Sequence, residues 1–213
     1  MVEGVAPEPF TFTQWAGFAE ATWTIVDGFN LTGGARYDDH STFGSKWSPR
    51  AYAVWNINDN VTLKGGVSRG FKTPRVEQIA EGIIGFGRQG TLPLLGTPGL
   101  SPETSTSYEA GLYYDSHGFF SGNVTLFNND FNDRITSGVF VPNCQFAASP
   151  NRPGCVDVGN FPTIEQFSQS INIDKARTRG AEVATRFTFS PAVSLVLNYT
   201  YTDSEQLSGP NEG

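Results

Sequence analysis

The chain has 213 residues and a formal net charge of −7, with 14 Lys and Arg against 21 Asp and Glu. This balance argues against nucleic-acid binding, because neutralising phosphates requires concentrated Lys and Arg. Aromatic residues make up 13% of the chain and hydrophobic residues only 38%, with 24 glycines and one methionine. Such a composition favours large pleated sheets with thinly spread apolar side chains over one compact core. No apolar run reaches the roughly 18 residues that a membrane-spanning helix needs.

Eight segments show the alternation of apolar and polar residues that is typical of β-strands. In the last of them, Val193, Leu195 and Leu197 share one face, while Ser194 and Asn198 take the other. Several segments are longer than the strands of soluble proteins usually are. The predicted strands, in chain order, are 12–26, 29–41, 46–57, 61–70, 104–116, 118–137, 170–190 and 193–204.

The connections between these segments are sorted by length. Four are tight hairpin turns of two to four residues, at 27–28, 58–60, 116–118 and 190–192. The connections at the other strand ends are longer, and two of them run over about 70–103 and 138–169. Outer-membrane barrels have short periplasmic turns and long extracellular loops, whereas a soluble sandwich has no reason to sort its connections. We therefore predict an all-β fold, an antiparallel up-and-down transmembrane β-barrel segment.

Aromatic and basic residues fit this prediction. Many Trp, Tyr and Phe residues fall near strand ends or on the apolar face, where the interfacial girdle of a barrel would need them, although ordinary sheet packing also uses them. Lys175, Arg177 and Arg179 alternate in phase with the apolar face, which places them on the outer wall at the level of phosphorylated lipid headgroups. A bulge at Gly180 would turn them into the lumen instead.

The two cysteines, Cys144 and Cys155, lie within one polar segment rich in Pro and Asn. We predict a disulfide formed in an oxidising compartment, and we weigh a metal site lower because no His accompanies the pair. Oxygen-rich strand ends such as 38–40 lack the spacing of a calcium loop. We therefore expect no metal site and no cofactor.

Two motifs with enzymatic associations are present. Residues 66–70 fit the G-x-S-x-G pattern of a hydrolase with Ser68 as nucleophile, but that motif needs a following helix and a His base, and only His40 and His117 are available. Residues 85–90 fit G-x-G-x-x-G without the strand and helix that a phosphate site requires. We predict that the protein is not an enzyme.

Four blocks resemble the TonB-dependent outer-membrane receptors for ferric siderophores. They are "VSRGFKTPRVEQI" (67–79), "GLSPETSTSYEAGLYYD" (99–115), "LFNNDFNDRI" (126–135) and "NIDKARTRGAEVA" (172–184), in the order that the family has them. The resemblance implies a 22-stranded barrel plugged by an N-terminal domain, in the outer membrane of a Gram-negative bacterium. Eight predicted strands, with no plug domain and no C-terminal strand signature, would make residues 1–213 a partial barrel that does not transport alone.

The resemblance also implies partners and site residues. The partners would be a ferric siderophore, with a catecholate type as a guess, the TonB system acting through the absent plug domain, and outer-membrane lipid or lipopolysaccharide. Arg75, Phe86, Arg88 and Arg152 in the long loops are candidate ligand-binding residues, because an anionic chelate calls for guanidinium groups and aromatic surfaces. The polar faces would line the lumen or touch the plug through Glu20, Arg36, Arg50, Glu109, Glu182 and Arg186.

An alternative hypothesis is a small standalone outer-membrane barrel of eight strands with a structural or adhesion role. Such a barrel closes only if the segment 12–26 pairs with the segment 193–204. Its interior would be just wide enough for side chains, so the charged residues of the polar face would have to pair there.

Overall fold

The computed structural model describes residues 11–208, except for the side chains of 137–139. Within these residues ten strands form one sheet, with one short α-helix and one 3₁₀ turn. None of the described helices is long and apolar enough to cross a membrane. The elements are β1 (Gln14–Val26), β2 (Phe29–His40), β3 (Gly44–Asn56), β4 (Val61–Lys72), α1 (Val76–Ile79), β5 (Ile83–Gly87), η1 (Arg88–Gly90), β6 (Leu92–Leu95), β7 (Glu103–Asp115), β8 (Phe120–Pro142), β9 (Gln166–Ser190) and β10 (Val193–Gln206).

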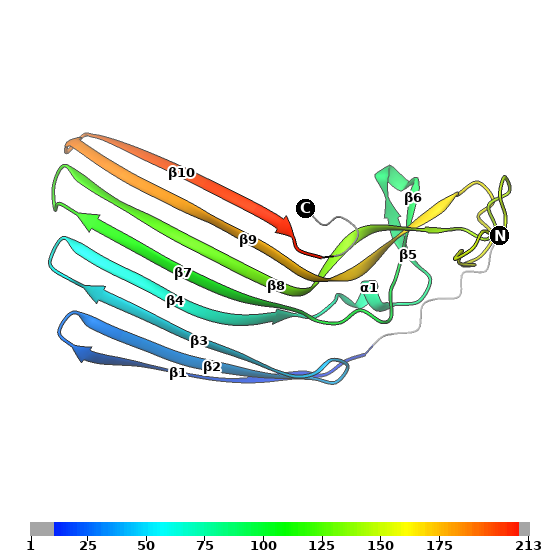
Figure 1. The fold of residues 1–213 in the computed structure, drawn as a ribbon, viewed down its shortest axis with the longest axis horizontal. Coiled ribbons are helices and arrows are strands. Elements are labelled where there is room, and N and C mark those ends of the chain that lie inside the picture. Colours follow the sequence, from blue (N-terminus) through cyan, green and yellow to red (C-terminus); the bar gives the residue numbers. More distant parts are fainter. Residues whose placement is uncertain (1–10, 209–213) are drawn as a thin grey trace.

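Eight long strands lie side by side in chain order, each antiparallel to the next (Figure 1). They correspond to the eight predicted strands. The count of eight is nevertheless too low for the sheet as a whole, because β5 and β6 form a further hairpin inside the predicted loop. This hairpin joins the sheet through a short parallel pairing of β6 with β9, a contact between distant residues that local alternation does not reveal.

The sheet is open. Within the described residues, β1 pairs only with β2, and β10 pairs only with β9. The pairing of the first with the last strand, on which the standalone eight-stranded barrel depends, is therefore not formed. The long strands β1 and β10 each keep one edge of unpaired backbone groups, and the short strand β5 forms a third edge.

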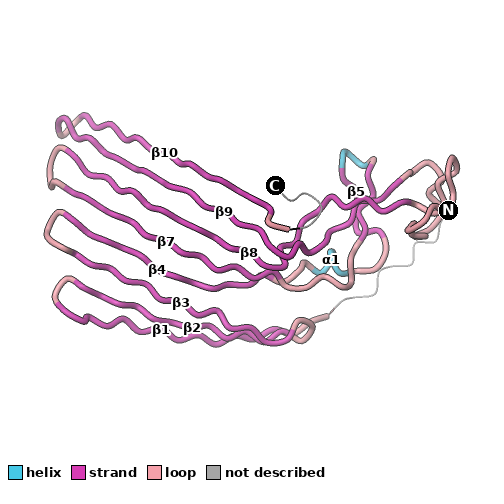
Figure 2. The backbone as a smooth tube through the Cα atoms, viewed as in Figure 1, coloured by secondary structure: helices cyan, strands magenta, loops and turns pink. Residues whose placement is uncertain are grey.

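The two long loops lie at the end of the sheet opposite the tight turns, as predicted, but the third connection at their end, 41–43, is no longer than those turns. Figure 2 shows four short connections at one end of the long strands and the irregular segments at the other. The short ones are 27–28, 57–60, 116–119 and 191–192, and the others are 41–43, 73–102 and 143–165. Because consecutive strands alternate in direction, every long loop lies at one end of the sheet.

One face of the sheet carries the apolar residues. A continuous cross-strand row runs through Gly65, Ala110, Leu126, Ala181 and Tyr201. Two large side chains of this row are nevertheless exposed to more than half, Tyr201 at 56% and Leu126 at 57%. Apolar side chains exposed along a whole sheet face are what the lipid-facing wall of a barrel requires.

Aromatic rings bound this apolar band at both ends. Towards the long loops, Tyr37 lies between Trp15 and Trp47, with ring centroids 5.3 and 5.0 Å away. Trp23 and Trp55 lie near the short turns. About 26 Å of strand separates Trp15 from Trp23 at the usual rise per residue, and at the usual tilt of a barrel strand this length spans about 20 Å of membrane height, somewhat less than the usual apolar band.

The buried core of the described residues lies at the long-loop end. Phe167 is fully buried, and its ring meets Phe161 edge-on with centroids 6.3 Å apart. Leu95, Leu100, Ile173 and Ala176 are also buried in this core. The strands are thus held mainly by their backbone ladders, and the loops have a small core of their own.

Candidate ligand-binding site

The β5–β6 hairpin is fixed on the part of β9 that extends beyond the apolar band. Leu94 and Leu95 pair with Ser168 and Gln169. Just beyond β6, the hydroxyl of Thr97 donates to the Ser170 carbonyl at 2.8 Å. These bonds hold the hairpin against the β8–β9 extension, so the residues at its tip have a defined position (Figure 1).

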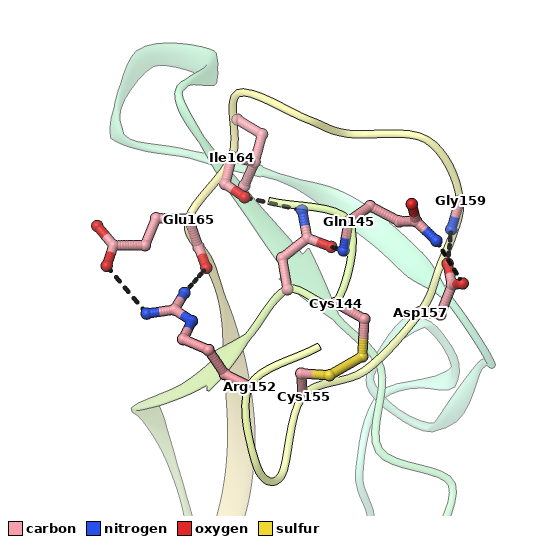
Figure 3. Close-up of a disulfide and its surroundings, with 9 residues drawn as sticks. Cys144, Gln145, Arg152, Cys155, Asp157, Gly159, Ile164 and Glu165 are labelled. Atoms are coloured by element: carbon pink, nitrogen blue, oxygen red, sulfur yellow. Dashed lines mark hydrogen bonds and ion pairs between the residues drawn. A yellow bond between two sulfur atoms is a disulfide. The ribbon is translucent and has the colours of Figure 1, made fainter. Parts of the chain in front are cut away.

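The neighbouring loop, 143–165, contains the predicted disulfide between Cys144 and Cys155 (Figure 3). In the same loop the side chain of Gln145 donates to the Asp157 carboxylate at 2.8 Å, and the Gly159 N–H donates to that carboxylate at 3.1 Å. The Gln145 bond, followed by the Gly159 bond, lowers the pKa of Asp157 below its ordinary value. The carboxylate therefore stays charged, and both bonds persist, to a lower pH than an isolated Asp would allow.

Asn143 holds the base of this loop. Its side chain is fully buried, and its amide donates to the carbonyls of Phe161 at 2.8 Å and Ile164 at 2.7 Å. Its carbonyl oxygen accepts the Gln145 N–H at 2.9 Å. A buried amide with satisfied partners fixes the path of the chain, because every alternative leaves polar groups unpaired.

Two predicted ligand-binding residues lie at the tip of the β5–β6 hairpin. The guanidinium of Arg88 lies over the ring of Phe140, 5.8 Å from its centroid. Phe140 is 42% exposed and Phe86, on β5, is 57% exposed. Arg88 and Phe140 therefore form an exposed pair of a cation and an aromatic ring at the long-loop end, which we call the hairpin cluster, while the register turns Phe86 to the other face of the hairpin.

Arg75 and Arg152 lie elsewhere. Arg75 is exposed at the start of α1 and lines a pocket of about 320 Å³ together with His40. Arg152 donates to the carboxylate and the carbonyl of Glu165 at 3.2 and 2.7 Å (Figure 3). The Arg152 guanidinium is thus engaged within its own loop, and its role in ligand binding stays a prediction.

The polar face of the sheet carries all six residues predicted to face the lumen or the plug, since the register places each of them opposite the apolar face. Glu20 and Arg50 form an ion pair. These two residues line two adjoining hollows of about 400 and 360 Å³, the first also lined by Arg36 and the second by Glu109. Glu182 and Arg186 lie apart from this group, on β9.

Two features of these surfaces were not predicted. Phe140 was missed as a partner of Arg88, because only the folded β8–β9 extension brings it close. Phe18 stands 80% exposed on the polar face of β1. The alternation within 14–26 could have revealed Phe18, since it is a large apolar residue out of phase with its strand.

The hydrolase hypothesis has no support in the geometry. Ser68 lies inside β4, opposite Arg50 and Ser107, and not at a strained turn before a helix. His40 Nδ1 accepts the Thr42 N–H, and the His117 ring bonds the Asp59 carbonyl at a short turn. Neither bond brings a His base to Ser68.

Comparison with known proteins decides the family. Residues 4–213 match the family described as "TonB dependent receptor-like, beta-barrel". The chain belongs to the TonB-dependent receptor family. The receptor chain is 40% identical over 199 residues to the iron-regulated outer membrane virulence protein of Vibrio cholerae, covering 92% of this chain and 28% of that protein. It is 34% identical to the ferric enterobactin receptor of Pseudomonas aeruginosa, and the match covers 86% of this chain and 24% of that protein.

Solved structures agree with this assignment. The siderophore receptor PirA of Pseudomonas aeruginosa superposes with a TM-score of 0.75 at 26% identity, covering 92% of this chain and 35% of that one. The receptor chain thus spans about a quarter of the length of the curated relatives given above. The family places it in the outer membrane of Gram-negative bacteria as part of a non-enzymatic receptor, which confirms the predicted location and the prediction that it is not an enzyme.

Proposed function

We propose that this receptor segment forms part of the wall and mouth through which a ferric siderophore of the catecholate type is taken up in a TonB-dependent manner. The segment supplies loops that bind the chelate. The plug domain through which TonB would act belongs to the complete receptor. Several relatives support the ligand class by their names, which are ferric enterobactin receptor and ferrienterobactin receptor.

The hairpin cluster is the observation that carries this proposal. A ferric catecholate is an anion with aromatic rings at its surface. A guanidinium can donate to its anionic oxygens and also stack on its rings, and the exposed ring of Phe140 adds apolar contact area. The pairing of β6 with β9 holds these groups in place before the ligand arrives, which lowers the entropy lost on binding.

We further propose that residues 1–213 do not transport by themselves. The edges at β1 and β10 expose rows of unpaired backbone N–H and C=O groups, and a lipid bilayer offers these groups no partners. Pairing with further strands of the complete receptor would satisfy both edges. Experiments on function therefore use the full-length receptor that carries this chain.

Replacing Arg88 with glutamine in the full-length receptor is expected to weaken binding of a ferric tris-catecholate about tenfold. Hydrogen bonds to charged groups contribute about 1.5–3 kcal/mol, and tenfold corresponds to about 1.4 kcal/mol. Arg88→Lys should recover only part of the affinity, because lysine keeps the charge but not the planar fork. Quenching of tryptophan fluorescence during titration measures the affinity.

Lys64→Gln is the matched control, because Lys64 lies over the ring of Tyr113, well below the loops, and should leave affinity unchanged. A folded Arg88→Gln receptor with the affinity of the unaltered receptor would contradict the role of the hairpin cluster. Equal binding of a ferric hydroxamate would contradict the proposed ligand class.

A further inference from the structure

Strand β9 has different neighbours on its two edges. One edge pairs with β8, and this pairing is regular around Gly180. The alternative in which a bulge at Gly180 turns Lys175, Arg177 and Arg179 into the lumen therefore does not hold, and the three side chains share the outer-wall face of Ala181, as expected. The other edge of β9 pairs with β10 within the apolar band and with β6 beyond it.

The β5–β6 hairpin thus continues the sheet beyond β10, as Figure 1 shows. β10 pairs with β9 as far as Gln206↔Ala176, and β6 takes the same edge of β9 at Ser168 and Gln169. β6 therefore has, beyond the band, the place that β10 has within it. β5 lies on the far side of β6 from β9, so it forms the outermost strand at this end of the sheet.

β5 is an open edge. Within residues 11–208 it pairs only with β6, and beyond the register shift between Ile83 and Gly85 that pairing is regular. The five residues of β5 include no charged residue and no proline, with which natural edge strands prevent the addition of another strand. The backbone N–H and C=O groups that face away from β6 are therefore available to an extended chain.

The end of β10 leads towards this edge. β10 runs antiparallel to β9, towards the long loops, and beyond it the Leu207 N–H still donates to the Lys175 carbonyl at 3.0 Å. About 17 Å further along β9, at the usual rise per residue, the Ser170 carbonyl already accepts the hydroxyl of Thr97. A chain that continues from β10 cannot follow β9 past this point, because β6 holds this edge and β8 holds the other. In the plane of the sheet, the edge that remains open to it is that of β5.

We propose that the loop that follows β10 in the complete receptor adds an extended strand to the open edge of β5. Main-chain hydrogen bonds to β5 hold this loop beside the tip of the hairpin, and the exposed ring of Phe86 packs against its side chains. The hairpin is then paired on both edges, which fixes the position of Arg88 more firmly than β9 does alone. The proposal rests on the complete barrel of the proposed function and not on its ligand.

Photo-crosslinking in the full-length receptor tests which segment lies on β5. Phe86 is replaced by p-benzoylphenylalanine, which keeps an aromatic ring at a site that is 57% exposed and should therefore leave the fold intact. After irradiation, mass spectrometry of the digested monomer should find this residue joined to a peptide of the same chain that follows residue 208. Phe119 is the matched control, because it is 56% exposed at a short turn, and the same replacement there should not reach that peptide.

Hydrogen exchange of the unaltered full-length receptor, without ligand, measures whether the edge is paired. An open edge lets the amides that point away from β6 exchange as fast as those of an unfolded chain, whereas a paired β5 should slow every amide of 83–87 about a hundredfold. Unprotected amides in 83–87 would overturn the proposal. A cross-link from residue 86 to a segment before β1 or to a second copy of the receptor, or no cross-link, would overturn it as well. Both expected results in a receptor that binds no ferric catecholate would leave this proposal standing and contradict only the proposed ligand class.

Discussion

Replacing Gly180 with valine is expected to lower the free energy of unfolding of the full-length receptor by about 3 kcal/mol, the upper part of the usual range for overpacking. Gly180 lies in β9 between two paired strands, opposite Phe127 on β8 and Thr202 on β10. A Cβ atom there would meet the carbonyl oxygen of Tyr201 and would lie 2.7 Å from Cζ of Phe127. The carbonyl belongs to the backbone ladder, so relief of the clash requires separation of β9 from β10.

Urea unfolding followed by tryptophan fluorescence measures this effect in the refolded receptor. Gly17→Val is the matched control, because a Cβ at Gly17 in β1 meets nothing within 4 Å. Its unfolding midpoint should stay close to that of the unaltered receptor. Equal midpoints for the Gly180 and Gly17 variants would show that the β8–β9–β10 packing described above is wrong.

Removing the disulfide, by Cys144→Ser with Cys155→Ser, is expected to destabilise the loop 143–165 by about 3 kcal/mol, the loop-closure contribution for a bridge of this size. The cysteines are 11 residues apart. The effect should stay local, since the backbone ladder of the long strands does not depend on this loop. The barrel should therefore unfold at the same urea concentration while the loop opens more often.

Limited proteolysis detects that opening. Cleavage within 143–165 should become at least tenfold faster in the double variant, and it should become equally fast in the unaltered receptor treated with a reducing agent. Cleavage rates that do not change would mean that the hydrogen bonds of Asn143 alone hold the loop. A lowered urea midpoint of the whole barrel would contradict the local role of the loop.

Much of the sheet could be predicted because its strands obey one periodicity. The segment 193–204 alternates with only Val196 and Asp203 out of phase, and β10 covers Val193–Gln206. Alternation also predicts the polar face of the sheet for Glu20 and Arg50, and the register of the strands places both there. Beyond the apolar band, the sequence no longer follows this alternation of apolar and polar residues. Residues 83–95 form a hairpin whose position depends on a pairing with β9 about 75 residues further along, which no local pattern encodes.

The candidate site was predictable in its residue types but not in its geometry. An arginine and aromatic residues in long loops suggested anion binding, and Arg88 does lie at an exposed aromatic surface. Its partner Phe140 comes from the β8–β9 extension, which the sequence pattern ended at residue 137. Arg152 has the same chemistry as Arg88, yet its partner Glu165 lies within its own loop. Composition identifies candidate residues, and only the fold shows which of them is engaged within its own loop.

Uptake of radioactive ferric iron by cells tests the central claim most directly. Iron-limited cells that lack their own catecholate receptors would express the full-length receptor and receive iron as the ferric tris-catecholate. We expect accumulation that requires the receptor, requires TonB, and falls in the Arg88→Gln variant at limiting ligand. A receptor that reaches the outer membrane and still gives no TonB-dependent accumulation of this chelate would contradict it.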